Sequence, residues 1–202
     1  GDDDAKPENY PKSMGIETFI TNRALQIEAL LKQQEKISLA ELKRVKFDNA
    51  YHAASHQIGV LNTWMSELDL NEFNEQEQAA LELLKHWNLH TDQHNPVAAL
   101  AVLTLDPVQK ANGKHVENTK ITQNFKQVVA DLIKYHGSFN IAYSQEFRLA
   151  HGDKSSAING GPDTLRAVYG KELNDNGQAE IKAGDGFMMF VSWDKNGAVY
   201  SE

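Results

Sequence analysis

The hydrophobic pattern of this chain changes its period at about Gly137. Before that point, apolar residues recur every three to five positions, which is typical of amphipathic helices. After it, glycines are frequent, and the apolar run 186–193 leads into Asp194-Lys195-Asn196-Gly197, a hairpin turn signal. The sequence therefore predicts a mainly α fold with a small β portion near the C-terminus.

The pattern divides the chain into three regions. Residues 1–15 are polar, acidic and interrupted by prolines, which predicts an extended arm. Residues 16–136 form a helical region, and residues 137–202 form a mixed segment with a short helix and a terminal β-hairpin. Helices are expected at 16–34, from 39 to about 45, and at 52–68, 75–87, 98–103, 122–135 and 165–169.

The polar stretch 106–120 is expected to be a long loop. The paired glycines Gly160 and Gly161 are expected to make a tight turn, with Pro162 opening the short helix 165–169 and Gly170 ending it. The same glycines lack the Lys-Ser/Thr pair of a phosphate loop. The run 186–193 is expected to be a buried strand.

Composition excludes several classes of protein. The net charge of −8, from 28 Asp and Glu against 20 Lys and Arg, argues against a nucleic-acid binder, which needs a concentrated basic face. There is no cysteine, so disulfide frameworks and thiolate chemistry are excluded. No apolar run approaches the roughly 20 residues needed to cross a bilayer. We therefore expect neither nucleic acid nor membrane as a partner.

Histidines raise the hypothesis of a metal site, because side chains four residues apart on a helix lie on one face. The histidines with this spacing are His86, His90 and His94, and His52 with His56. The break at Asn95-Pro96 predicts that the helix has ended near His90, which would separate the trio. No His-Glu-x-x-His motif is present. We expect surface histidines and no cofactor in this segment, and a metal-responsive protein stays an alternative.

No catalytic motif is complete in the sequence. Nucleophilic catalysis requires an activated hydroxyl or thiol with a base and an orienting partner. Ser55-His56 and Ser155-Ser156 are too common to indicate such a group, and there is no Gly-x-Ser-x-Gly elbow. The residues alone indicate a helix-rich domain without a self-contained active site.

Several short segments nevertheless resemble the penicillin acylase family, in the branch of aculeacin and acyl-homoserine-lactone acylases. The Thr-Asn-Arg and Gly-Gly-Pro-Asp stretches are the most specific of them. The segments, in chain order, are Met14-Gly15-Ile16-Glu17, Thr21-Asn22-Arg23-Ala24-Leu25, Ser38-Leu39-Ala40-Glu41-Leu42, Lys46-Phe47-Asp48, Trp87, residues 160–170, and residues 184–187 continuing to Trp193-Asp194.

The resemblance implies an αββα-sandwich N-terminal nucleophile hydrolase. In that family a precursor cleaves itself into a small and a large chain, and the new N-terminal Ser attacks an amide to form an acyl-enzyme. An oxyanion hole of backbone and Asn donors assists, and an Arg on the helix after that Asn orients the site electrostatically. Arg23 matches this Arg, as an auxiliary catalytic residue in the intact enzyme only. The alternative interpretation is that Arg23 is an ordinary helix-surface arginine that pairs with a carboxylate.

The same resemblance implies that this chain is an internal fragment of the large chain. The Ser and the Asn would lie upstream of it, so the fragment alone is expected to be inactive. The parent would be periplasmic or secreted, would bind structural calcium outside this region, and would cleave an acyl group from a β-lactam, a homoserine lactone or a lipopeptide amide. The expected partners are the rest of the large chain and the small chain.

The two ends fit this expectation, since the chain opens on Gly1 and stops at Glu202 directly after a strand-like segment. A fragment is expected to expose apolar helix stripes and the unpaired edges of the hairpin, and to self-associate through them. The alternative from another class is a stand-alone helical binding or scaffold module without catalytic activity.

Overall fold

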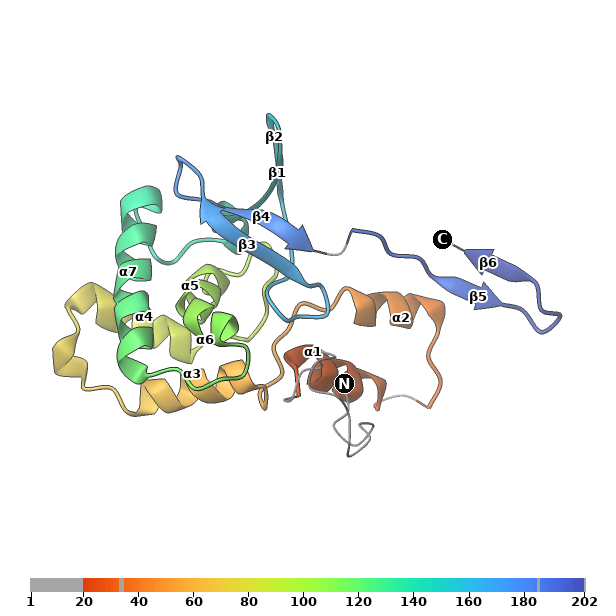
Figure 1. Cartoon of the computed structure of the whole chain (residues 1–202), viewed down its shortest axis with the longest axis horizontal. Helices are drawn as coiled ribbons and strands as arrows, with labels where there is room; N and C mark the ends of the chain where they lie inside the picture. The colour runs from red at the N-terminus through yellow and green to blue at the C-terminus, as the bar shows by residue number, and fades with distance from the viewer. Residues whose placement is uncertain (1–19, 33–34, 185, 202) are drawn as a thin grey trace.

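The computed structural model describes residues 20–32, 35–184 and 186–201. Helices occupy the first two-thirds of the chain, and two small sheets follow (Figure 1). The helices are α1 (Asn22–Leu31), α2 (Leu39–Lys46), α3 (His56–Ser66), the 3₁₀ turn η3 (Leu70–Glu72), α4 (Glu75–Lys85), α5 (Ala98–Thr104), α6 (Asp106–Ala111), α7 (Asn118–His136) and α8 (Tyr143–Glu146). The mainly α prediction with a small β portion agrees with this architecture; the expected arm 1–15 lies outside the described residues.

The helix ends follow local sequence signals. Ser38 and Glu41 form a reciprocal capping box at the start of α2, with Ser38 N donating to Glu41 Oε2 at 2.8 Å. Asn74 and Glu77 make the same arrangement at the start of α4. Helix α7 ends at Gly137, whose φ of 76° is the left-handed conformation that favours glycine. These boundaries are therefore set by the residues themselves.

The core lies among α3, α4, α5 and α7. Helix α5 is buried around most of its circumference, because Ala98 and Ala101 have no exposed surface and neither has Leu100. The ring centroids of Trp64 and Phe125 lie 5.5 Å apart, and this contact joins α3 to α7. The indole N–H of Trp64 also donates to Thr122 Oγ1 of α7 at 2.9 Å.

The larger sheet lies over this helical core (Figure 1). Its strands are β1 (Phe147–His151), β2 (Lys154–Ala157), β3 (Val168–Leu173) and β4 (Ala179–Gly184), in the order β2-β1-β4-β3. Strands β1 and β4 pair in parallel, whereas the other two pairs are antiparallel. The Phe147 ring stacks on Tyr143 of α8 with centroids 4.5 Å apart, which anchors β1 to the buried side of the molecule.

The structure corrects two predictions and contains one element that was not predicted. Residues 106–120 are not one loop, because α6 forms at Asp106–Ala111 with a proline in its first turn, and α7 begins at Asn118. The expected helix 165–169 does not form, since Val168 begins β3 and pairs with Gly184 of β4. The hairpin of β1 and β2 was not predicted, because its outer strand is exposed throughout and carries no apolar alternation.

The terminal hairpin forms as predicted, from β5 (Val191–Trp193) and β6 (Val199–Ser201) around residues 194–197. It is not buried, however, and the strand is shorter than the apolar run. Phe187 is 82% exposed and Trp193 is 67% exposed. The two strands pair only with each other and extend away from the helical core (Figure 1). The apolar run therefore reflects an uncovered surface in this chain.

None of the helices in the described part of the chain is both long enough and apolar enough to span a bilayer.

Candidate functional site

Arg23 lies in the first turn of α1 and is paired with Asp163, which is 140 residues further along the chain. Its Nε donates to Asp163 Oδ1 at 3.1 Å. The Arg23 side chain is 44% exposed, whereas that of Asp163 is 11% exposed. The carboxylate therefore fixes the inner side of the guanidinium, and much of the cationic group lies at the surface.

Asn22 is fully buried next to this pair and joins three segments of the chain. Its backbone N–H donates to Asp163 Oδ2 at 2.8 Å, and its Nδ2 donates to the Asp163 carbonyl at 2.9 Å. The same Nδ2 donates to the Ala50 carbonyl, and Asn22 Oδ1 accepts from the backbone N–H of His52 at 2.7 Å. Thr21 Oγ1 caps the helix by accepting from Ala24 N. The first turn of α1 is thus locked to the 160–164 loop.

The backbone of that loop is constrained at two positions. Asp163 adopts a left-handed φ of 61°, which Asp tolerates better than most residues. Gly160 has a φ of 102°, and a Cβ placed there would lie 2.1 Å from the Arg166 carbonyl oxygen. Thr164 Oγ1 donates to carbonyls at both ends of the turn. The loop conformation therefore depends on a glycine and delivers the carboxylate of Asp163 to α1.

The Lys46-Phe47-Asp48 segment joins the same loop from the other side. Lys46 Nζ donates to the Leu165 carbonyl at 3.0 Å, and the Asp48 carbonyl accepts from Arg166 N at 2.8 Å. The Arg166 guanidinium lies 5.9 Å from the centre of the Phe47 ring. Three short motifs that are far apart in the sequence thus meet in one place.

Two buried tyrosines support the loop from below. Tyr51 OH donates to the Pro162 carbonyl at 2.5 Å, and Tyr143 OH donates to the Gly160 carbonyl at 2.7 Å. Burial raises the pKa of Tyr51 well above its usual value, and the charge of Asp163 adds to the effect. Burial likewise raises the pKa of Tyr143. Both hydroxyls therefore stay protonated donors near neutral pH.

A small cavity of about 100 Å³ lies beside the ion pair. Gln57, which is buried at 5% exposure, donates from Nε2 to Asp163 Oδ2 at 2.9 Å and to Gln109 Oε1. Its Oε1 has no hydrogen-bond partner among the described residues. The residues lining the cavity are Thr21, Arg23, His56, Gln57, Val108, Gln109, Asn112, Gly113, Asp163 and Tyr169. The cavity therefore offers a hydrogen-bond acceptor to a small donor molecule or to water.

The histidines His86, His90 and His94 of the metal hypothesis do not form a metal-binding group. His86 is the C-cap of α4, whereas His90 and His94 lie in the following irregular segment and bond to Asn49 and Gln93 respectively. Over the described ranges, no group of three or more His, Cys, Asp or Glu side chains is arranged to hold a metal ion.

The pairs Ser55-His56 and Ser155-Ser156 do not form a nucleophilic site. Ser55 Oγ is buried without a hydrogen-bond partner in the described part of the chain, and Ser155 Oγ accepts from Arg148 Nε. Neither hydroxyl is therefore activated by a base in this structure.

The sequence suggested Arg23 as a candidate, but not its partner Asp163, nor Gln57, which donates to the same carboxylate. A signal was present, because an Asp after Pro in a Gly-Gly turn can adopt a left-handed conformation and place its carboxylate on a helix N-terminus. Gln57 carries no such signal, since nothing in its surroundings distinguishes it from other polar helix residues.

The site is built from the segments that suggested the resemblance, and a comparison with known proteins agrees with it. The family model described as penicillin amidase matches residues 3–201. A comparison with curated proteins found no match. Because the family match extends over nearly the whole sequence, this chain belongs to the penicillin amidase family.

Proposed function

We propose that this chain is the helical part of the large chain of an amidohydrolase that cleaves an acyl group from a small amine through an acyl-enzyme. The substrate amine would be a β-lactam nucleus, a homoserine lactone or a lipopeptide core, in keeping with the acylase branch that the motifs resemble. The observation that supports the proposal best is the convergence of these motifs on residues 160–166, where Asp163 holds Arg23 and where Leu165 and Arg166 bond to Lys46 and Asp48.

Within this proposal, Arg23 supplies an oriented positive charge to a reaction centre on neighbouring parts of the polypeptide. An Arg paired on one side by a buried carboxylate is held in one orientation, and oriented charges stabilise developing negative charge in a transition state. The nucleophile and the oxyanion donor would come from other segments of the precursor. These residues alone would then lack hydrolytic activity.

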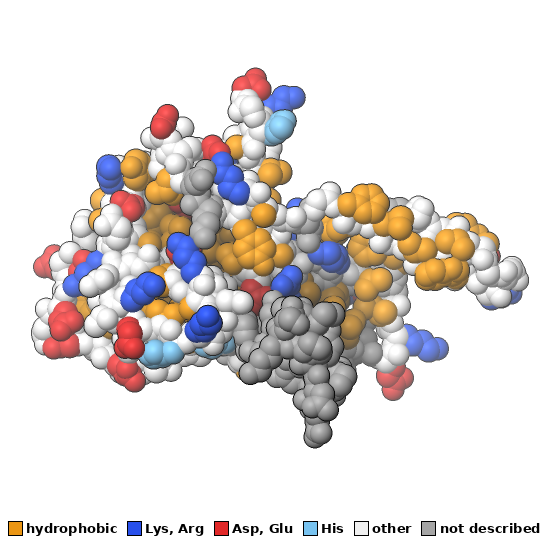
Figure 2. Space-filling model, viewed as in Figure 1, with side chains coloured by type: hydrophobic (Ala, Val, Ile, Leu, Met, Phe, Trp, Pro, Cys, Tyr) orange, Lys and Arg blue, Asp and Glu red, His pale blue; other side chains and the backbone are white. Residues whose placement is uncertain are grey.

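The exposed apolar surface supports a role as part of a larger assembly. Large apolar side chains are exposed on α1, on α2 and on the segment 186–201 that contains the terminal hairpin. Figure 2 shows apolar side chains along this projecting segment. The exposed side chains on these three parts are Ile27, Leu31, Leu39, Leu42, Phe187, Met189, Trp193, Val199 and Tyr200. We propose that the remainder of the large chain and the small chain cover these faces in a periplasmic or secreted enzyme. A stand-alone scaffold module would have no need to expose them.

The proposal is tested by Arg23→Leu in the full-length precursor. We expect a loss of amide turnover of about a hundredfold, because removal of a group that stabilises transition-state charge has effects of that order. The matched control is Arg44→Leu on α2, whose side chain is 75% exposed and pairs weakly with Glu41. Mass spectrometry would follow self-cleavage, and hydrolysis of acyl-amine substrates would follow turnover.

Unchanged self-cleavage together with unchanged turnover in Arg23→Leu would overturn the role of Arg23. A loss of the same size in Arg44→Leu would show that general damage, and not a specific charge, is responsible.

A further inference from the structure

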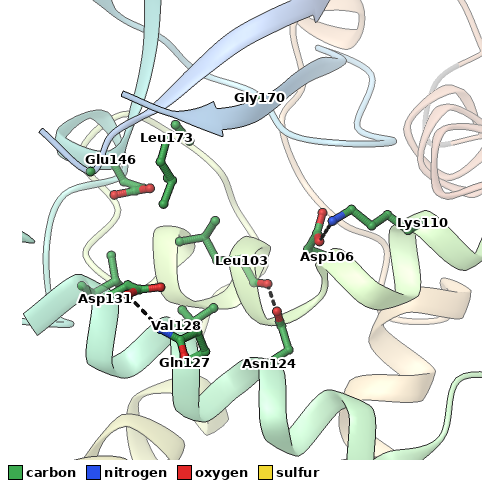
Figure 3. A pocket seen from close by; sticks show the side chains of 13 residues that line it. Leu103, Asp106, Lys110, Asn124, Gln127, Val128, Asp131, Glu146, Gly170 and Leu173 are labelled. Atoms are coloured by element: carbon green, nitrogen blue, oxygen red, sulfur yellow. Dashed lines mark hydrogen bonds and ion pairs between the residues drawn. The ribbon is translucent and has the colours of Figure 1, made fainter. Parts of the chain in front are cut away.

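A second cavity lies between the helices α5, α6 and α7 and the strands β3 and β4. It encloses about 190 Å³ and is partly open to solvent. Figure 3 shows its side chains pointing inward from the helices below and the strands above. Its lining residues include Leu103, Val128, Asp131, Leu132, Glu146 and Leu173.

One end of this cavity is acidic. Glu146 is 1% exposed, and its Oε2 bonds to His136 Nε2 at 2.8 Å. Its carboxylate also accepts a hydrogen bond from the backbone N–H of Ala179. A carboxylate has about four lone-pair positions, so these two bonds leave it with capacity to accept more. Figure 3 places Asp131 at the same end of the cavity as Glu146.

Among the residues that the structure describes, Asp131 forms no ion pair with a Lys, Arg or His side chain. Its Oδ1 accepts from the neutral amide of Gln127 at 3.0 Å. The nearby Lys134 donates to Tyr135 OH and lies over that ring. Burial raises the pKa of Glu146, and the charge of Asp131 adds to the rise. His136 is the basic group that pairs with Glu146, so the two carboxylates leave this end of the cavity with more acidic than basic groups.

The other walls of the cavity are apolar or carry a carboxylate that is paired with a lysine. Leu103, Val128 and Leu132 form the helical side, and Leu173 projects from β3 above them (Figure 3). At the far end, Asp106 pairs with Lys110, so that this end carries no excess charge. The cavity thus combines an acidic end with an apolar body, and small-molecule sites have this composition.

We propose that this cavity binds a small aliphatic ammonium ion, with the ammonium group at Glu146 and Asp131 and the hydrocarbon chain on Leu103, Val128, Leu132 and Leu173. The volume is below the roughly 300–1,000 Å³ of sites for drug-sized ligands, which favours a chain of a few carbons. An ammonium donates three hydrogen bonds and accepts none, which complements two carboxylates. The inference does not depend on the proposed hydrolase function.

A cation with a hydrocarbon chain explains the lining better than the other ligand classes do. A bare metal ion would leave the apolar walls unused, and the described residues contain no three-ligand group. An anion would be repelled by the two carboxylates, and a neutral alcohol would leave their excess charge uncompensated.

The test is titration of the ¹⁵N-labelled 202-residue chain with butylammonium chloride, butan-1-ol and sodium butyrate. The three probes each contain four carbon atoms and differ in charge. We expect butylammonium alone to bind, with a Kd of about 1 mM, and to shift the amide resonances of Gly170, Gly177 and Ala179, which line the cavity.

Two variants test whether the ammonium group binds at Glu146 and Asp131. Glu146→Gln and Asp131→Asn should each weaken butylammonium binding about tenfold, because each removes a charged hydrogen-bond acceptor. The control is Asp153→Asn, which changes the net charge equally at the exposed turn between β1 and β2 and should leave the Kd unchanged. If Glu146→Gln does not fold, Asp131→Asn decides the question, since that side chain is only half-buried.

Three outcomes would overturn the proposal. Equal binding of butan-1-ol would reduce the site to an apolar cavity. Equal weakening by Asp153→Asn would indicate diffuse attraction to an acidic protein. Absence of shifts at Gly170, Gly177 and Ala179 would place any binding elsewhere.

Discussion

At the scale of single residues, Asp163 carries more of the site than Arg23 does. One buried carboxylate accepts hydrogen bonds from a backbone N–H of α1, from Gln57 and from Arg23. The Arg23 side chain is partly exposed, so that solvent screens its ion pair with this carboxylate. The exposed cation is the functional candidate, and the buried anion is what positions it.

We therefore expect Asp163→Asn to lower the free energy of unfolding by about 2 kcal/mol, because buried hydrogen bonds to a charged group are replaced by weaker ones and an amide N–H₂ faces donors. Urea unfolding of the 202-residue chain measures the change. Asp153→Asn, which removes an exposed carboxylate, should change stability by less than about 0.5 kcal/mol. Equal stability of the two variants would contradict the prediction.

Glu146 gives a pH dependence with a defined sign. Burial raises its pKa in the folded state above 4.5, while the hydrogen bond and charge of His136 lower it. A raised pKa in the folded state means that the native protein binds more protons than the unfolded chain over that interval. The contribution of Glu146 to stability is therefore full below pH 4.5 and is lost as the pH rises through the folded pKa.

Replacing His136 by Ala should raise the pKa of Glu146 further, because the two interactions that lower it disappear. Carboxyl ¹³C NMR titration of Glu146 in both proteins measures this. A pKa that falls or stays constant in His136→Ala would show that burial and His136 do not act on Glu146 as described.

At the scale of elements, the 160–164 loop requires glycine at one position for a steric reason. Gly152, in the turn between β1 and β2, also has a positive φ, of 60° against 102° at Gly160, but it has open space around it. Gly160→Ala should cost more than about 3 kcal/mol, whereas Gly152→Ala should cost about 1 kcal/mol, since only the former forces a Cβ against a carbonyl oxygen. Thermal and urea unfolding measure the loss of unfolding free energy in each variant. Losses of similar size in the two variants would contradict the steric explanation for Gly160.

At the scale of the whole molecule, the uncovered hairpin and helix faces predict self-association of the 202-residue chain. Trp193→Ser combined with Phe187→Ser should shift the chain toward monomer, because these are the most exposed large apolar side chains of the hairpin region. Analytical sedimentation at high concentration measures the effect. Leu70→Ser, which removes an exposed apolar side chain on η3, is the control. A wild-type chain that is strictly monomeric would refute the prediction.

The sequence determined most of the local structure by itself. The capping boxes at Ser38 and Asn74, the glycine end of α7 and the turn at 194–197 all rest on interactions within a few residues, so that sequence patterns identify them. The motifs around Arg23 and Gly160 also identified the family. Local signals nevertheless misplaced a helix at 165–169, because β4 pairs with that segment and outweighs its propensity.

Tertiary structure alone decided how these pieces meet. Arg23 and Asp163 are 140 residues apart, and no local pattern specifies that a turn carboxylate will accept from a helix N-terminus so far away. Likewise, Glu146 becomes an acidic wall only because α7 and β4 enclose it. The run 186–193 is largely exposed because β5 pairs only with β6 in the described residues, although its composition predicted a buried strand. Contacts between distant segments depend on the whole packing arrangement, whereas caps and turns depend on their neighbours in the chain.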